Sequence, residues 1–246
     1  MVSLKRAFSA FVLAVGFSAS AMAAPIVIDD FALPATGNVV TRNTNGTAVG
    51  SQTRAGIIGG DRDYSATRTV GTVAVGTFSK IGGNVFTVDN NSNTGRGIGR
   101  LHYDGTAGGF LTTGLDVDLT DMGTNNQFQF KDFSVNGTQP LNIAQTMSTT
   151  VTDVFGGTFT LVQGLMIQGG NYTIAFSNFS GAGVDMTRVA SIDFQFDNRV
   201  GFGQAGSDVE SSFLEANMAT PEPGTIVLAL TGAAGLAFVA RRKKNS

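Results

Sequence analysis

The stretch IDFQFD at residues 192–197 decides the fold class. Ile192, Phe194 and Phe196 alternate with three polar residues, so the apolar side chains point to one face of an extended chain and the polar ones to the other. A strict period of two is typical of a β-strand that packs against a core with one face only. We therefore expect the segments on either side of this stretch to be strands of the same kind.

The same alternation recurs along the flanking sequence. QFQF at residues 127–130 alternates cleanly, and Phe133 and Val135 continue in the opposite phase, which predicts a β-bulge near Lys131 and Asp132. Apolar residues show no helical spacing, and no repeat of fixed period occurs. Further short strands are expected at residues 26–31, 69–78, 84–88, 98–103, 146–155, 158–162, 165–168 and 172–176. The sequence thus predicts an all-β fold, an antiparallel β-sandwich of the jelly-roll type.

The composition restricts how this body is stabilised and what it binds. The chain of 246 residues has no Cys, so no disulfide supports the core, and it has no Trp. Six of the sixteen Lys and Arg, but only one of the eighteen acidic residues, lie in the two terminal segments described next. Ten basic and seventeen acidic side chains remain, a net charge near −7. Proteins bind nucleic acid mainly through clustered Lys and Arg that neutralise its phosphates, so nucleic acid is not an expected partner of this acidic body.

Residues 1–23 are expected to be a signal peptide. Two basic residues precede an apolar run from residue 7 to about residue 17, which is too short to span a bilayer. The small residues Ala21 and Ala23 then form the pattern that signal peptidase accepts, with cleavage before Ala24. Residues 24–220 are therefore expected to be one exported β-sandwich domain.

The C-terminal residues 221–246 have three parts in fixed order. Pro221, Glu222 and Pro223 form a triplet, and residues 225–240 are apolar apart from two Thr. A membrane helix is expected here, carried by Ile226, Val227, Leu228, Leu230, Leu236, Phe238 and Val239. The last part is the basic cluster Arg241, Arg242, Lys243 and Lys244. This cluster is expected to stay in the cytoplasm and leave the body outside. A plain single-pass anchor is the alternative reading.

These three parts together resemble the PEP-CTERM sorting signal. The resemblance implies that an exosortase-type sorting protease recognises the triplet and removes the helix, so the inner membrane is a transient partner. It also implies a Gram-negative bacterium that makes exopolysaccharide, with a periplasmic intermediate and a final place at the cell surface or in the extracellular matrix.

The body has a resemblance of its own, carried by short segments at residues 28–31, 59–63, 103–105 and 114–119. They are similar to the jelly-roll bodies of PEP-CTERM proteins, and through them to galactose-binding-like and carbohydrate-binding modules. Such modules often hold a structural calcium between the first and last strands. The resemblance implies Asp29 or Asp30 together with Asp208 as ligands of a Ca²⁺ ion.

Residue types for nucleophilic catalysis are scarce. His102 is the only His, Cys is absent, and no G-x-S-x-G elbow occurs. Alternation places His102 on the face opposite Leu101 and Tyr103, where we expect a partly exposed strand residue. Paired Asp residues are plentiful, so glycosidase chemistry stays open by residue type.

Other acidic clusters are candidate cation sites. Asp89, Asn91 and Asn93 alternate as in an EF-hand, but Thr94 and Arg100 stand where that loop needs Gly and Glu, which excludes it. A looser turn site formed by the same three residues stays open, and Asp116, Asp118 and Asp121 form a similar, looser oxygen cluster. Arg62, between Asp61 and Asp63, is interpreted as part of a surface ion network.

The sequence therefore predicts an exported, exosortase-sorted surface protein, a non-enzymatic structural or adhesive component of an exopolysaccharide or biofilm matrix. No catalytic residue is expected, and Ca²⁺ is the one cofactor considered. The alternative is a carbohydrate-binding module with a defined glycan ligand, and a hydrolase that uses paired Asp stands behind both.

Overall fold

The structure is a computed structural model. It describes residues 24–31, 38–42, 46–70, 77–82, 85–90, 96–106, 108–137, 145–165, 169–197 and 207–218. The signal peptide, the triplet, the membrane helix and the basic cluster expected from the sequence lie outside these residues. No helix among the described residues is long and apolar enough to cross a membrane.

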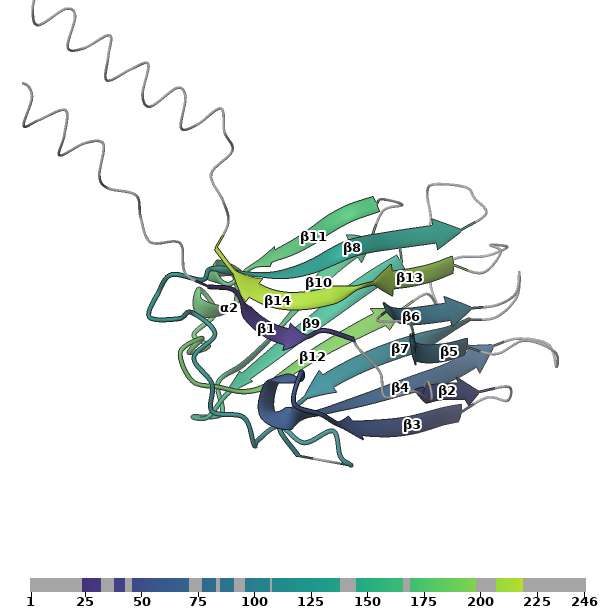
Figure 1. The fold of residues 1–246 in the computed structure, drawn as a ribbon, viewed down its shortest axis with the longest axis horizontal. Helices are drawn as coiled ribbons and strands as arrows, with labels where there is room; N and C mark the ends of the chain where they lie inside the picture. Colours follow the sequence, from purple (N-terminus) through teal and green to yellow (C-terminus); the bar gives the residue numbers. More distant parts are fainter. Residues whose placement is uncertain are drawn as a thin grey trace, which may run out of the picture.

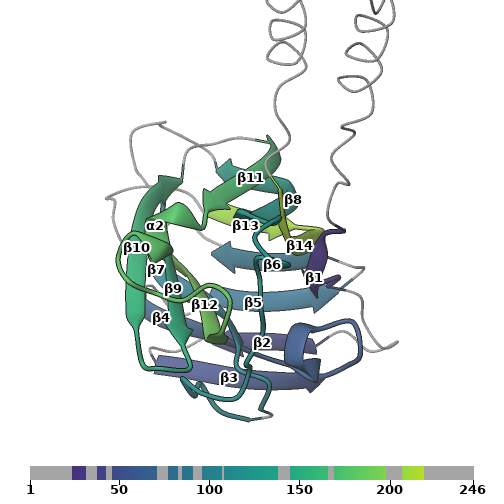
Figure 2. The ribbon, with the colours of Figure 1, turned by 90° about the vertical axis from the view of Figure 1, so that its left-hand side faces the viewer.

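Two antiparallel sheets lie face to face (Figures 1 and 2). The eight-stranded sheet contains β1 (Ile26–Asp29), β2 (Asn38–Arg42), β5 (Thr77–Gly82), β6 (Val85–Asn90), β8 (Gln127–Gly137), β11 (Gly169–Ala175), β13 (Ser207–Ser211) and β14 (Phe213–Asn217). The six-stranded sheet runs in the order β10 (Thr158–Leu165), β9 (Gln145–Asp153), β12 (Val189–Asp197), β7 (Arg96–Tyr103), β4 (Asp61–Val70) and β3 (Gly46–Thr53). Within the described ranges two short helical turns accompany them, η1 (Ile58–Gly60) and α2 (Ser177–Ser180).

Most connections cross from one sheet to the other, as from β6 to β7, β7 to β8, β8 to β9 and β12 to β13. Hairpins that stay within one sheet, such as β5–β6 and β9–β10, are the minority. This winding confirms the predicted antiparallel β-sandwich of the jelly-roll type. Of the strand expected at residues 69–78, the first two residues lie at the end of β4 and the last two at the start of β5, and residues 71–76 lie outside the described residues.

The core between the sheets is built from phenylalanine. On β12, Phe194 is fully buried and meets Phe130 and Phe128 of β8 edge to face, with ring centroids 4.9 and 5.6 Å apart. Edge-to-face rings add to the stability that burial alone supplies. The one-sided strand predicted from the alternation at residues 192–197 is therefore confirmed, since Ile192, Phe194 and Phe196 all face this core.

The predicted bulge in β8 is confirmed. Phe130 and Phe133 are both fully buried although three positions separate them, and Asp132 between them has φ 48°. The pairing of β8 with β11 shifts register at this point. The extra residue turns Phe133 and Val135 back to the core.

The two ends of the described body lie side by side. β1 pairs antiparallel with β14, and Ile26 stands opposite Ala216 (Figure 1). The start of β1 and the end of β14 thus lie at the same end of the sandwich.

Candidate functional site

A polar row crosses the outer face of the six-stranded sheet. The pairing of β3, β4, β7, β12, β9 and β10 aligns, in this order, Ser51, Asp63, His102, Asp193, Thr150 and Thr160. These residues occupy the polar positions of alternating strands whose apolar positions face the core. Ionisable side chains from three strands therefore meet in the middle of this sheet.

The segment at residues 104–115, which follows β7, folds over this row. The Gly109 N–H donates to Asp63 Oδ2 at 2.9 Å, and the Leu111 N–H donates to Asp104 Oδ2 at 2.8 Å. The segment can approach closely because Gly114 has φ 143° and a Cβ there would come within 2.1 Å of the Asp104 carbonyl oxygen. The polar row is consequently covered where β4 and β7 lie beneath this segment.

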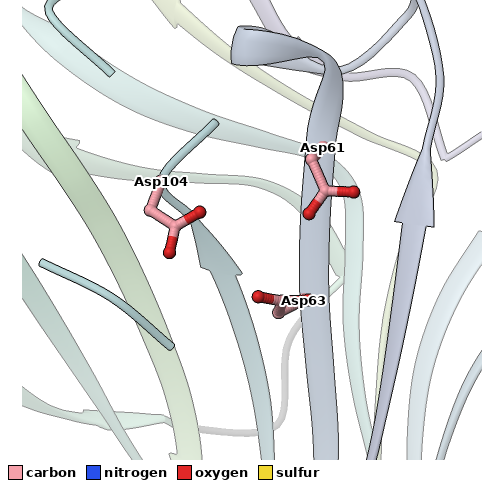
Figure 3. A group of neighbouring side chains, drawn as sticks. All are labelled: Asp61, Asp63 and Asp104. Atoms are coloured by element: carbon pink, nitrogen blue, oxygen red, sulfur yellow. The ribbon is translucent and has the colours of Figure 1, made fainter. Parts of the chain in front are cut away.

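Three carboxylates gather under the cover: Asp61 and Asp63 from β4, and Asp104 just after β7 (Figure 3). One oxygen from each lies within 4.8 Å of the others, and the residues are 3, 3 and 1% exposed. Asp61 accepts hydrogen bonds from Thr53 Oγ1 at 2.9 Å and from Ser51. Burial raises the pKa of the Asp61 carboxyl, and the nearby charges of Asp63 and Asp104 add to this, against the hydrogen bonds that lower it. We call these three residues the acidic cluster.

The acidic cluster offers oxygen atoms only. Carboxylate and hydroxyl oxygens suit a hard cation such as Ca²⁺, whereas a site for zinc would be expected to contain His or Cys. Protonation of one carboxyl relieves the same repulsion without an ion. In the sequence, Asp61 and Asp63 stand out only as the neighbours of Arg62 and as part of the segment at residues 59–63. The usable signal is that Asp61 and Asp63 lie on one face of a strand and that Asp104 directly follows the adjacent strand β7.

His102 is buried, so the expectation of partial exposure is wrong. Its Nδ1 lies 2.9 Å from Asp193 Oδ2, and its Nε2 lies 2.6 Å from the Leu111 carbonyl oxygen. The same Asp193 oxygen accepts from Arg100 Nε at 2.5 Å, and the Arg100 guanidinium lies 4.2 Å from the centroid of the Phe110 ring. The contact with the Leu111 carbonyl ties the covering segment to the His102 ring. Among the described residues no hydroxyl or thiol nucleophile bonds to this ring.

The calcium ligands implied by the resemblance have other partners here. Asp29 Oδ1 accepts from Arg62 Nη1 at 2.5 Å inside the core, and Asp30 accepts from both terminal nitrogens of Arg54 at 2.9 Å. The side chain of Asp208 lies outside the described residues. Calcium at this set stays a prediction.

Arg62 is not on the surface, as the sequence interpretation had it. Its side chain is fully buried and faces the core, and it also bonds to Gln52. Burial raises the pKa of Asp29 in spite of the Arg62 charge that lowers it.

The looser cluster of three aspartates is not brought together as a cation site. Asp116 forms an exposed ion pair with Arg188 at 2.6 Å. Asp118 accepts hydrogen bonds from the hydroxyl and the N–H of Thr120 and from the N–H of Met122. These bonds lower the pKa of Asp118, although its partial burial acts in the opposite direction. These contacts shape the turn at residues 118–124.

Comparison with known proteins identifies the C-terminal segment. Residues 219–243 match the family described as the PEP-CTERM protein-sorting motif. No curated protein matches the chain in sequence.

Solved structures resemble the chain only distantly. They include a family 11 carbohydrate-binding module of a Clostridium thermocellum cellulosomal cellulase, with 14% identity and a TM-score of 0.36 over 81% of this chain and 98% of that one. A family 30 carbohydrate-binding module has 12% identity and a TM-score of 0.37 over 79% and 99%. The family 11 xylanase from Neocallimastix patriciarum has 12% identity and a TM-score of 0.38 over 75% and 100%. Both binding modules and an enzyme are among these structures, and similarities this distant allow no conclusion about ligand or activity.

Proposed function

We propose that this protein is exported, released from the membrane by an exosortase-type protease, and retained outside the cell as a non-enzymatic component of an exopolysaccharide matrix. The observation that carries the proposal is the PEP-CTERM protein-sorting motif at residues 219–243. The motif implies processing at the membrane and a destination at the cell surface. The matrix role goes beyond the motif and is the part that needs a test.

The body supports a role without catalysis. The acidic cluster brings carboxylates together, but its members are at most 3% exposed, and a polysaccharide must reach both carboxyl groups of a glycosidase. His102 is held by Asp193 and by a backbone carbonyl rather than by a nucleophile. Turnover of a glycan that is lost in Asp63→Asn would contradict this reading.

The adjacent ends of the body fit a tethered intermediate. Because β1 and β14 pair, the mature N-terminus and the start of the sorting segment leave the same end of the sandwich. The polar outer face of the six-stranded sheet can then face the matrix while the tail is still in the membrane. A protein that presents hydroxyl-rich strands, such as the paired Thr150 and Thr160, offers hydrogen bonds to neutral polysaccharide.

The test separates sorting from polysaccharide association. The exported protein is incubated with exopolysaccharide from the producing cells and sedimented, and the producing cells are fractionated in parallel. Replacing Pro221, Glu222 and Pro223 by Ala is expected to retain the protein in the membrane fraction. Protein that reaches the matrix fraction but never sediments with polysaccharide would refute the matrix role and leave the sorting role intact.

A second candidate, a defined glycan site, is favoured by one observation. Phe155, in the β9–β10 turn, is 71% exposed, and the Arg188 guanidinium lies 5.3 Å from its ring centroid. An exposed ring beside the Arg188–Asp116 pair can stack a sugar and hydrogen-bond its hydroxyl groups. A glycan array is expected to show binding that Phe155→Ala removes and Met122→Ala, another exposed apolar residue, keeps. Absence of binding to any glycan would eliminate this candidate.

A further inference from the structure

One border of the six-stranded sheet is an open strand edge. β10 is the outermost strand and pairs with β9 alone, in a register that runs without a shift from Thr158 to Leu165 (Figure 2). The Asp153 N–H donates to the Gly157 carbonyl at 2.8 Å, which sets the phase of the hairpin. The backbone groups that point away from β9 therefore belong to Thr158, Thr160, Val162 and Gly164. No described residue hydrogen-bonds to them along the backbone.

This edge lacks the features that keep strand edges apart. Soluble proteins protect an edge with Lys, Pro, a bulge or a covering element. β10 has the sequence TFTLVQGL, without charge, Pro or bulge, and Asp153 is the only charged residue of the hairpin at residues 145–165. Helix α2 does not cover the edge, because Phe179 meets Phe159 from the core side, with ring centroids 6.2 Å apart.

The opposite edge of the six-stranded sheet, formed by β3, is less open to pairing. β3 also pairs with one strand only, but β2 of the second sheet lies close beside it. β3 also begins at Gly46 and has Gly50 in its middle, and glycine weakens a strand as a pairing template. Of the two borders, β10 is thus the one that is free to pair.

We propose that β10 pairs with β10 of a second copy of this protein, so that two six-stranded sheets join into one. This inference is independent of the proposed function. A second copy supplies a partner edge of the same kind: the body as a whole is acidic, but β10 carries no charge, so two identical edges meet without local repulsion. A partner with a basic segment would find no carboxylate on β10.

The chemistry of the strand selects the register. With the two-fold axis at Leu161, Thr160 stands opposite Val162 of the second copy, and Thr158 stands opposite Gly164 of the second copy. All four outward-facing residues then form paired backbone bonds, about eight hydrogen bonds in all. The half-buried Leu161 meets its own copy on the core face, and Thr160 forms β-branched pairs on the outer face. Shifting the axis by one residue to Thr160 leaves Gly164 unpaired and loses two of these bonds.

The first test uses sedimentation velocity on the exported full chain over a wide concentration range. We expect a concentration-dependent dimer that Val162→Lys converts to monomer. The matched control is Val49→Lys, since Val49 on β3 and Val162 on β10 are 64 and 61% exposed on the two borders of one sheet. The control should leave the dimer intact. A monomer at every concentration, equal effects of both variants, or open-ended polymers would overturn the two-fold arrangement.

The second test reads the register by cysteine cross-linking, which is clean because the chain has no Cys. Leu161→Cys is expected to give a disulfide-linked dimer under mild oxidation, because residues opposite each other in a non-hydrogen-bonded pair come close enough to bridge. Thr160→Cys alone should stay monomeric on a denaturing gel. Cross-linking of Thr160→Cys without Leu161→Cys would refute the axis, and cross-linking of neither would refute the pairing.

Discussion

Replacement of Arg62 by Met tests the account of the core most sharply. Arg62 on β4 and Asp29 on β1 are both fully buried, and their pair at 2.5 Å joins the two sheets. Asp29 also accepts from Tyr103 Oη at 3.0 Å and from the Phe31 N–H at 2.8 Å. Arg62→Met keeps a long apolar side chain in place but removes the charge, so Asp29 is left in the core with neutral donors only.

The expected loss follows from the burial of both groups. Removing one member of a buried pair destabilises a protein by about 3–5 kcal/mol, because the remaining charge stays uncompensated. Arg54 and Asp30 form the matched control, since both side chains are 29% exposed and their atoms lie at 2.9 Å. Because this pair is partly exposed, solvent screens it and it contributes about 1 kcal/mol or less, so Arg54→Met should have a small effect.

The pH dependence gives a second readout. The pKa of Asp29 is raised above its ordinary value of 3.8 by burial, and Arg62 is the main group that holds it down. Without Arg62 this pKa rises further. A carboxyl whose pKa is higher in the folded than in the unfolded state binds more protons when folded, so its contribution to stability falls as the pH rises through that interval. The loss in Arg62→Met should therefore shrink on acidification.

Urea unfolding followed by circular dichroism at neutral pH and at about pH 5 measures both effects. The double variant Arg62→Met/Asp29→Asn should recover most of the loss, because it removes the buried charge as well. Equal losses in Arg62→Met and Arg54→Met, or a loss in Arg62→Met that grows on acidification, would refute the reasoning.

Three further predictions concern other parts of the body. In the presence of a metal chelator, Asp61→Asn should stabilise the protein at neutral pH by about 1 kcal/mol, because it replaces a buried carboxylate that Asp63 and Asp104 repel by a neutral amide that donates hydrogen bonds. If Ca²⁺ instead raises the Tm of the parent protein and Asp61→Asn abolishes this rise, the cluster binds a cation. Asp153→Ala should lower urea stability by about 1–3 kcal/mol above pH 4, because the N–H groups of Asp185, Phe155 and Gly157 lose their acceptor. Since these bonds lower the pKa of Asp153, its contribution is present above its ordinary value of 3.8 and lost as the pH falls through the folded pKa, so a deficit that persists in strong acid would contradict the assignment. Phe194→Ala should cost about 3–5 kcal/mol in the same assay, and a loss below 1 kcal/mol would mean that the rings of β8 do not pack on it.

The sequence predicts the parts of the fold that alternation alone determines. The faces of β12 and the bulge in β8 follow from which residues are apolar, because a period of two leaves one solution for each strand. Alternation does not show what covers the polar face. His102 and Asp63 are buried because a later segment returns over the sheet, and that approach is visible only in three dimensions.

The buried ion pair was missed for a similar reason. Arg62 stands between two acidic neighbours, a pattern that is usual on surfaces, and its real partner Asp29 is 33 positions away on the other sheet. The acidic cluster likewise joins residues on adjacent strands that are distant in sequence. The open edge of β10 depends on strand order, which hydrophobic patterning does not specify. The sorting motif needed no fold at all, because it is read as a linear sequence.

The most direct test of the central claim is the intact mass of the protein recovered from the surface or matrix fraction of producing cells. We expect a chain that begins at Ala24 and ends near the triplet at residues 221–223, free of the inner membrane. A protein that keeps residues 225–246 and stays in the inner membrane would contradict it.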